Sequence, residues 1–249
     1  MNTPEASSRL PDAAEVRQRL DAFRARRGYL LPHQGAMAAA LPDLQDAYGP
    51  FYKTLILDLH HLGAFEREFV WLALLTAAKE AVGTHHLDLF FKNGGTERQG
   101  EASFRLVSWA LGSASFRFLE RHWQPYFPSV PARQAYHDGK AALLASFDGA
   151  LSEELAQLAL LAVYAAHADH WGLQVEIERC YHLGLSEAKM AEAFSLVMWP
   201  CGVNRFLEAC DIWVKVMNSG KVTPSAPFKA WAEQPDQQGF ALTPRGAVA

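Results

Sequence analysis

The sequence lacks several features that define whole classes of protein. Its three cysteines form no CxxC pair and no disulfide-like spacing, which favours a reducing compartment. No apolar run is long enough to cross a bilayer, and the first residues do not resemble a secretory signal. The net charge of −4 gives no basic excess, and no glycine-rich phosphate-binding loop occurs. We therefore expect a cytoplasmic protein that binds neither nucleic acid nor membranes.

Strand-like patterns are also scarce, and the composition favours helices. Alanine and leucine dominate, and no segment alternates between apolar and polar residues for long. Residues 69–78 and 155–168 are apolar on all sides, which is typical of buried helices rather than surface ones. The sequence therefore predicts an all-α fold built around at least two buried helices.

The chain repeats itself at an offset of ninety residues. When the sequence is shifted by that distance, aromatic residues and glycines coincide without a gap: Gly94 with Gly184, Phe104 with Phe194, Trp109 with Trp199, Gly112 with Gly202 and Trp123 with Trp213. Agreement at two tryptophan pairs in one register is improbable by chance. We predict two copies of one helical unit, residues 46–128 and 129–216, packed as one domain.

The flanking segments differ from the repeats. Residues 1–45 predict an arm with one amphipathic helix, from Ala14 to Arg26, and a loop. Residues 217–249 contain several prolines, which disfavour helix, so this tail is expected to be extended. Its aromatic residues Phe228, Trp231 and Phe240 would be unfavourable in water, so we expect the tail to lie along the body or a partner subunit.

A known family has the same order of elements as the first repeat. An acidic helix start at residues 65–68 precedes an apolar helix and then His86, and Gly94-Gly95-Thr96 begins eight residues after that histidine. This order resembles the carboxymuconolactone decarboxylase family, which includes the alkyl hydroperoxidase D-like proteins. The resemblance covers about residues 45–215 as a tandem pair. It implies interlocked helices and a homo-oligomer, a dimer or a trimer.

The chain departs from the peroxidase branch of that family. Peroxidase-type members carry a CxxC pair seven and four residues before the histidine, where this chain has Lys79 and Val82, and Asp169 and Gly172 in the second repeat. Because no thiol occupies these positions, peroxide reduction by a dithiol is not expected. Decarboxylase-type members also lack the thiol pair. The resemblance therefore implies a cofactor-independent lyase that acts by acid–base chemistry on a small carboxylated compound, ring-derived or a lactone.

The two repeats exchange an acid and an imidazole at matching positions. His86 corresponds to Glu176, and Glu80 corresponds to His170, so we predict these four as catalytic residues. Glu80 and His86 would point about 120° apart on a continuous helix, so a break at Gly83-Thr84 is required. The helix that follows would present its N-terminus to a substrate carboxylate.

Other polar residues near these positions complete the candidate site. We predict that substrate is bound by His85, His167, Trp171 and Thr84. A metal-dependent enzyme is an alternative, in which Zn or Fe would be held by His85, His86, His167, His170 and Glu176. A non-catalytic member of the family is a third possibility, which would be favoured by a pocket lined only by apolar groups, with Glu80 and His86 facing solvent. The sequence leaves these alternatives open.

Overall fold

The computed structural model describes residues 9–235 and 237, and its regular structure over these residues is entirely helical. This confirms the predicted all-α fold. The chain divides into two compact units, one ending at Asp58 and one beginning at Leu59. Each unit is described by itself below.

The first unit consists of consecutive helices that pack on their neighbours. They are α1 (Ala13–Arg27), α2 (Pro32–Ala40), α3 (Pro42–Tyr52) and the π-helical turn η1 (Lys53–Leu57). Asp12 caps the start of α1, and Gly28 ends it in the left-handed conformation with φ 80°. The helix expected at residues 14–26 is therefore confirmed. The loop expected after it is wrong, because Pro32 and Pro42 each begin a helix there.

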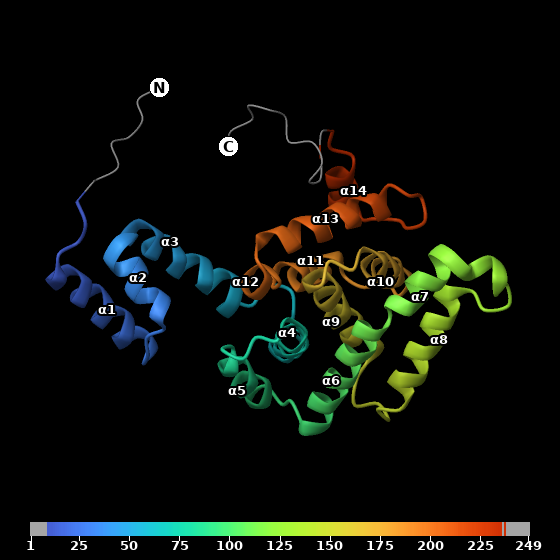
Figure 1. The fold of residues 1–249 in the computed structure, drawn as a ribbon, viewed down its shortest axis with the longest axis horizontal. Coiled ribbons are helices and arrows are strands. Elements are labelled where there is room, and N and C mark those ends of the chain that lie inside the picture. The colour runs from blue at the N-terminus through green and yellow to red at the C-terminus, as the bar shows by residue number, and fades with distance from the viewer. Residues whose placement is uncertain (1–8, 236, 238–249) are drawn as a thin grey trace. The chain divides into compact units, whose positions relative to one another are not determined.

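Two buried helices form the centre of the second unit. Helices α4 (Ala64–Ala78) and α9 (Glu153–Ala166) pack against each other, and the interior of each is almost wholly buried. Figure 1 shows α4 nearly end-on, with α9 beside it. These are the two segments whose apolar sequence predicted buried helices, and that prediction is confirmed. Their interior lacks a polar face because other helices cover them on several sides.

The surrounding helices complete the second unit (Figure 1). Helices α6 and α10 pack on α4 and α9 respectively, α11 packs on α9, and α13 packs on α10. The elements are α5 (Thr84–Lys92), α6 (Glu97–Gly112), α7 (Ala114–Phe118), η2 (Leu119–Trp123), η3 (Gln124–Tyr126), α8 (Ala132–Ala145), α10 (His170–His182), α11 (Glu187–Ser195), α12 (Met198–Cys201), α13 (Val203–Met217) and α14 (Ala226–Ala232).

Matching turns precede α6 and α11. Gly94 and Gly184 adopt positive φ angles of 92° and 69°. The side chains of Thr96 and Ser186 then cap the helices that begin at Glu97 and Glu187, ninety residues apart. The two turns agree with the predicted repeat in position and chemistry. The duplication of a whole unit stays a prediction.

The C-terminal segment contains a helix, so its predicted extended form is wrong over Ala226–Ala232. Pro227 lies in the first turn of α14, where a missing N–H costs nothing. The ring centroids of Phe228 and Trp231 lie 5.0 and 5.4 Å from that of Trp213. The aromatic residues thus pack on the body of the protein, as expected, while Phe240 lies outside the described residues.

None of the helices in the described part of the chain combines the length and the apolar character needed to span a bilayer.

Candidate functional site

Two charged residues lie inside the apolar helix α4. Arg67 is 5% exposed and Glu68 is fully buried. The guanidinium of Arg67 donates to Oε1 of Glu68 from Nη2 at 2.8 Å and from Nε at 3.1 Å. A buried charge is tolerated only when it is paired and hydrogen-bonded, and this two-pronged contact supplies both conditions. The core therefore contains a carboxylate whose negative charge is balanced by the guanidinium of Arg67.

A break between α4 and α5 brings the histidines back toward that carboxylate. Helix α4 ends at Ala78, the next residue Lys79 has a left-handed φ of 57°, and α5 begins after Gly83. A Cβ atom on Gly83 would lie 2.7 Å from Cδ1 of Leu75, so a larger residue here would require the Leu75 side chain to move. The predicted break is confirmed, although Gly83 rather than Thr84 is the N-cap.

His86 meets Glu68 at the centre of the candidate site. Nδ1 of His86 lies 2.7 Å from Oε2 of Glu68, and His86 is only 3% exposed. Its ring stacks on Trp71, with centroids 4.4 Å apart and planes 18° apart. The centroid of the His85 ring lies 4.1 Å from that of His86, with the planes tilted by 39°. The imidazole is therefore held in position by a carboxylate and by neighbouring rings.

This arrangement determines which nitrogen of His86 can react. Glu68 accepts the proton of Nδ1, which leaves Nε2 as the atom for proton exchange. Nε2 makes no hydrogen bond within the part of the chain that the structure describes. An imidazole oriented by a carboxylate through one nitrogen and open at the other is the usual arrangement of a general acid or base.

Sequence reasoning missed Arg67 and Glu68, which were assigned only to an acidic helix start. A signal was present, since both residues directly precede a long apolar run, from Phe69 to Leu75. Because the rest of this helix is apolar on all its faces, no polar face is left to expose its charged residues to solvent. The partner of Glu68, however, lies eighteen residues away across a helix break. No local pattern indicates that distance.

Glu80 lies apart from the buried cluster. It is exposed, and its Oε1 accepts the backbone N–H of Val82 at 2.7 Å. Within the described residues no hydrogen bond or ion pair joins Glu80 to His86. The expected convergence of these two residues is therefore not seen, because the break turns Glu80 into the loop. Thr84 is exposed at the first turn of α5, next to His85.

The histidines of the second half lie at the surface. His167 is exposed and its Nε2 lies 3.0 Å from the carbonyl oxygen of Ala77, which ties the end of α9 to α4. His170 is exposed at the first turn of α10, and Trp171 beside it is half-buried. Neither histidine contacts Glu176 through a hydrogen bond or ion pair in the described residues.

Glu176 is the centre of a second buried polar cluster. Its Oε2 accepts from Nζ of Lys140 at 2.6 Å and from the side-chain amide of Gln157, and its Oε1 accepts from the hydroxyl of Tyr136. All four residues are at most 2% exposed. The hydroxyl of Tyr164 extends the cluster at 2.9 Å from that of Tyr136. With three donors, the carboxylate is fully satisfied and is poorly placed to accept a substrate proton.

Electrostatics around this second cluster follow from its burial. Burial, together with the negative charge of Glu176, raises the pKa of Tyr136 well above its ordinary value of 10. Burial lowers the pKa of the nearby His137, and the positive charge of Lys140 acts in the same direction. Burial also raises the pKa of the Cys180 thiol, which disfavours the reactive thiolate. The tyrosine and cysteine side chains at this cluster therefore favour their neutral, protonated forms.

No group of three or more potential metal-ligating side chains gathers within residues 9–235 and 237. The alternative ligand set is divided in the structure. His86 is engaged with Glu68, His167 and His170 are at the surface, and Glu176 is bound by its three donors. The arrangement of these side chains thus gives the metal hypothesis no support.

Comparison with known proteins gave no relative. No family model matches the chain, and neither a curated protein nor a solved structure is significantly similar to it.

Proposed function

We propose that this protein is a cofactor-independent lyase, similar to carboxymuconolactone decarboxylases, that removes CO2 from a small carboxylated compound, ring-derived or a lactone. The observation that carries the proposal is the buried contact between Glu68 and His86. That contact leaves Nε2 as the proton-exchanging atom at the position where the family resemblance places its histidine.

The proposed reaction requires one proton transfer. The bond between the substrate and its carboxylate breaks, CO2 leaves, and the electron pair stays on the substrate carbon, delocalised into an adjacent carbonyl group. Nε2–H of the His86 imidazolium then donates its proton to that carbon. Glu68 stabilises the imidazolium through Nδ1, and solvent restores the proton afterwards. No redox step or cofactor is needed for this sequence.

The start of α5 supports binding of a negatively charged substrate. His85 and His86 lie in the first turn, where the helix dipole favours anions, although the backbone N–H of His86 already donates to the carbonyl oxygen of Gly83 at 2.9 Å. Thr84 is exposed beside them. We assign substrate contact to His85 and Thr84, and the second-half residues His167, His170 and Trp171 have no part in this step.

Two alternatives receive less support. Thiol peroxidase chemistry has no thiols at the required positions, which hold Lys79 and Val82. A non-catalytic role would be indicated if Glu80 and His86 were both exposed to solvent. Glu80 is indeed exposed, but His86 is buried on a paired carboxylate. Apolar residues in place of a buried ion pair are often as stable or more stable, so stability alone does not account for the His–Glu–Arg cluster.

The proposal is tested by decarboxylation assays with β-keto acids and carboxylated lactones. CO2 release is measured for the natural sequence, for His86→Gln and Glu68→Gln, and for His182→Gln, an exposed histidine at the end of α10 that serves as control. We expect His86→Gln and Glu68→Gln to lose at least a hundredfold in rate and His182→Gln to retain it. Equal rates in all variants, or no turnover of the panel by the natural sequence, would contradict the proposal.

We also propose that the chain forms a homo-oligomer, as the resemblance implies. Large apolar side chains are exposed on α5 and α6, among them Phe91 at 53%, Phe104 at 49% and Leu111 at 46%. Such residues are candidates for a subunit contact. Light scattering in solution should give a multiple of 27.6 kDa. A monomer at micromolar concentration would contradict this part of the proposal.

A further inference from the structure

A cavity in the second unit shares no residue with the His86 cluster. It lies where α7 and η2 meet the start of α10, with one residue of α13, and its volume is about 870 Å³. Basic side chains are frequent in its wall, and they are Arg117, Arg121, His122 and His170. This size and mixed lining are typical of sites for small organic ligands.

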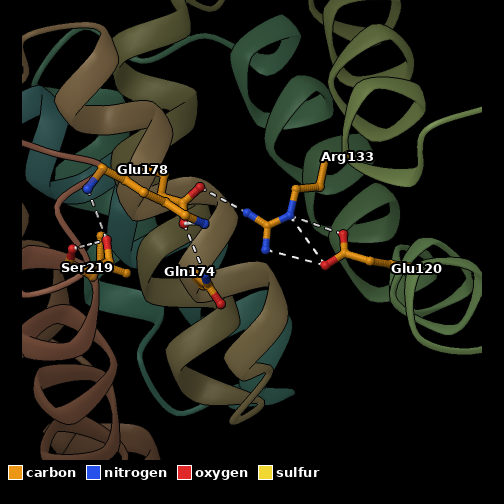
Figure 2. A network of polar contacts seen from close by, with 7 residues as sticks. Glu120, Arg133, Gln174, Glu178 and Ser219 are labelled. Atoms are coloured by element: carbon orange, nitrogen blue, oxygen red, sulfur yellow. Dashed lines mark hydrogen bonds and ion pairs between the residues drawn. The ribbon is translucent and has the colours of Figure 1, made fainter.

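The negative charges beside the cavity are already paired. Glu120, which lines the cavity, accepts from Nε of Arg133 at 3.1 Å, and Figure 2 shows Arg133 between Glu120 and Glu178. Asp169 caps α10 by accepting the N–H of Gly172, and it pairs with Arg117 at 3.2 Å. The carboxylates are thus neutralised by partners of their own.

Arg121 is left with an uncompensated charge at the cavity wall. Its guanidinium makes no ion pair or hydrogen bond within the described residues, and its side chain is exposed. The imidazoles of His122 and His170 line the same cavity and can donate hydrogen bonds to an anion. A chain with a net charge of −4 therefore has a locally positive cavity here.

The rest of the wall is apolar and partly rigid. The rings of Phe118 and Trp171 line the cavity together with Ile212. Trp171 is held by an edge contact with Tyr136, with centroids 5.4 Å apart. Gln174 is fixed by its hydrogen bond to Glu178 at 3.0 Å, which Figure 2 also shows. Aromatic rings beside a guanidinium suit a ligand that has a planar body and a carboxylate.

We propose that this cavity binds an aromatic carboxylate, with the carboxylate on Arg121 and the ring between Phe118 and Trp171. Guanidinium groups bind carboxylates through two parallel hydrogen bonds, and this geometry favours a carboxylate over a neutral amide of the same shape. The site differs from the proposed decarboxylation site in every residue. It can therefore bind its ligand even if that proposed function is wrong.

The test adds benzoate, benzamide or inorganic phosphate to the full-length protein. Binding of each probe is measured by NMR and by isothermal titration calorimetry. We expect saturable benzoate binding that shifts the indole N–H signal of Trp171, and binding of benzamide at least tenfold weaker. Arg121→Gln should weaken benzoate binding at least tenfold. Arg17→Gln, which removes another exposed arginine, on α1, should change it less than twofold.

A second variant separates the apolar wall from the charge. Phe118 is 45% exposed, so Phe118→Ala should leave the fold intact and weaken benzoate binding at least threefold. Absence of saturable benzoate binding would overturn the proposal. Equal effects of Arg121→Gln and Arg17→Gln would also overturn it, since the binding would then be non-specific. Phosphate binding as strong as that of benzoate, and lost in Arg121→Gln, would overturn the assignment to an aromatic ligand.

Discussion

Oε2 of Glu68 lies 2.7 Å from Nδ1 of His86, and this contact joins α4 to α5 across a helix break. Arg67 occupies the other oxygen of the same carboxylate. The three side chains form one buried series of contacts, so a change in one of them alters the hydrogen bonding of its neighbour. The expected consequences concern stability as well as chemistry.

Removal of Glu68 should be destabilising. Glu68→Ala removes the carboxylate that pairs with the buried Arg67, and breaking a buried ion pair in this way costs about 3–5 kcal/mol. The free energy of unfolding, measured by urea titration, should fall by that amount. Glu97→Ala, at the exposed start of α6, is the control and should change it by less than about 0.5–1 kcal/mol. Equal effects would show that the buried pair is not structurally important.

The Lys140–Glu176 pair should show coupling in a double-mutant cycle. Each single change, Lys140→Met or Glu176→Gln, disrupts the same buried cluster and should cost about 3 kcal/mol or more. The double variant should lose less than the sum, because the two groups interact directly at 2.6 Å. Simple additivity in urea unfolding would contradict this interpretation of the cluster.

Alkaline pH should destabilise the protein through its buried tyrosines. Burial raises the pKa of Tyr136 and Tyr164 above the ordinary value of 10, so the folded state keeps protons that the unfolded state releases. Their contribution is fully present below pH 10 and is lost as the pH rises above it. Tyr164→Phe should reduce the slope of stability against pH above 10 by up to about 1.4 kcal/mol per unit. Tyr126→Phe, at a residue that is 80% exposed, should leave the slope unchanged.

Helix α14 should contribute to stability through its aromatic contacts. Trp231→Ala removes a half-buried ring that packs edge-on against Trp213. We expect a loss of about 1–3 kcal/mol in the free energy of unfolding, together with a change in tryptophan fluorescence. Lys229→Ala, on an exposed face of α14, is the matched control. An unchanged midpoint for Trp231→Ala would show that α14 adds little.

The buried helices and their turns were predictable from local sequence. The apolar segments that became α4 and α9, and the caps at Thr96 and Ser186, depend on neighbouring residues alone. The helix over Ala226–Ala232 was not predicted, because proline content was read as preventing a helix. Pro227 lies in the first turn, where proline is tolerated.

The polar clusters could be predicted only in part. His86 and Glu176 were singled out from the repeat, and both proved to be buried and hydrogen-bonded. Their partners Glu68 and Lys140 lie eighteen and thirty-six residues away, and only tertiary packing determines such contacts. Glu80 looked like part of the site because it matched His170 in the repeat. It lies instead in the exposed loop that follows α4.

The protonated nitrogen of His86 is the most direct test of the account. Nitrogen-15 NMR of histidine-labelled protein, recorded at a pH where the ring is neutral, distinguishes the two tautomers. A carboxylate on Nδ1 predicts that Nδ1 carries the proton and Nε2 does not, and that Glu68→Gln abolishes this preference. A proton on Nε2 in the natural sequence, unchanged by Glu68→Gln, would contradict the proposed orientation of the imidazole.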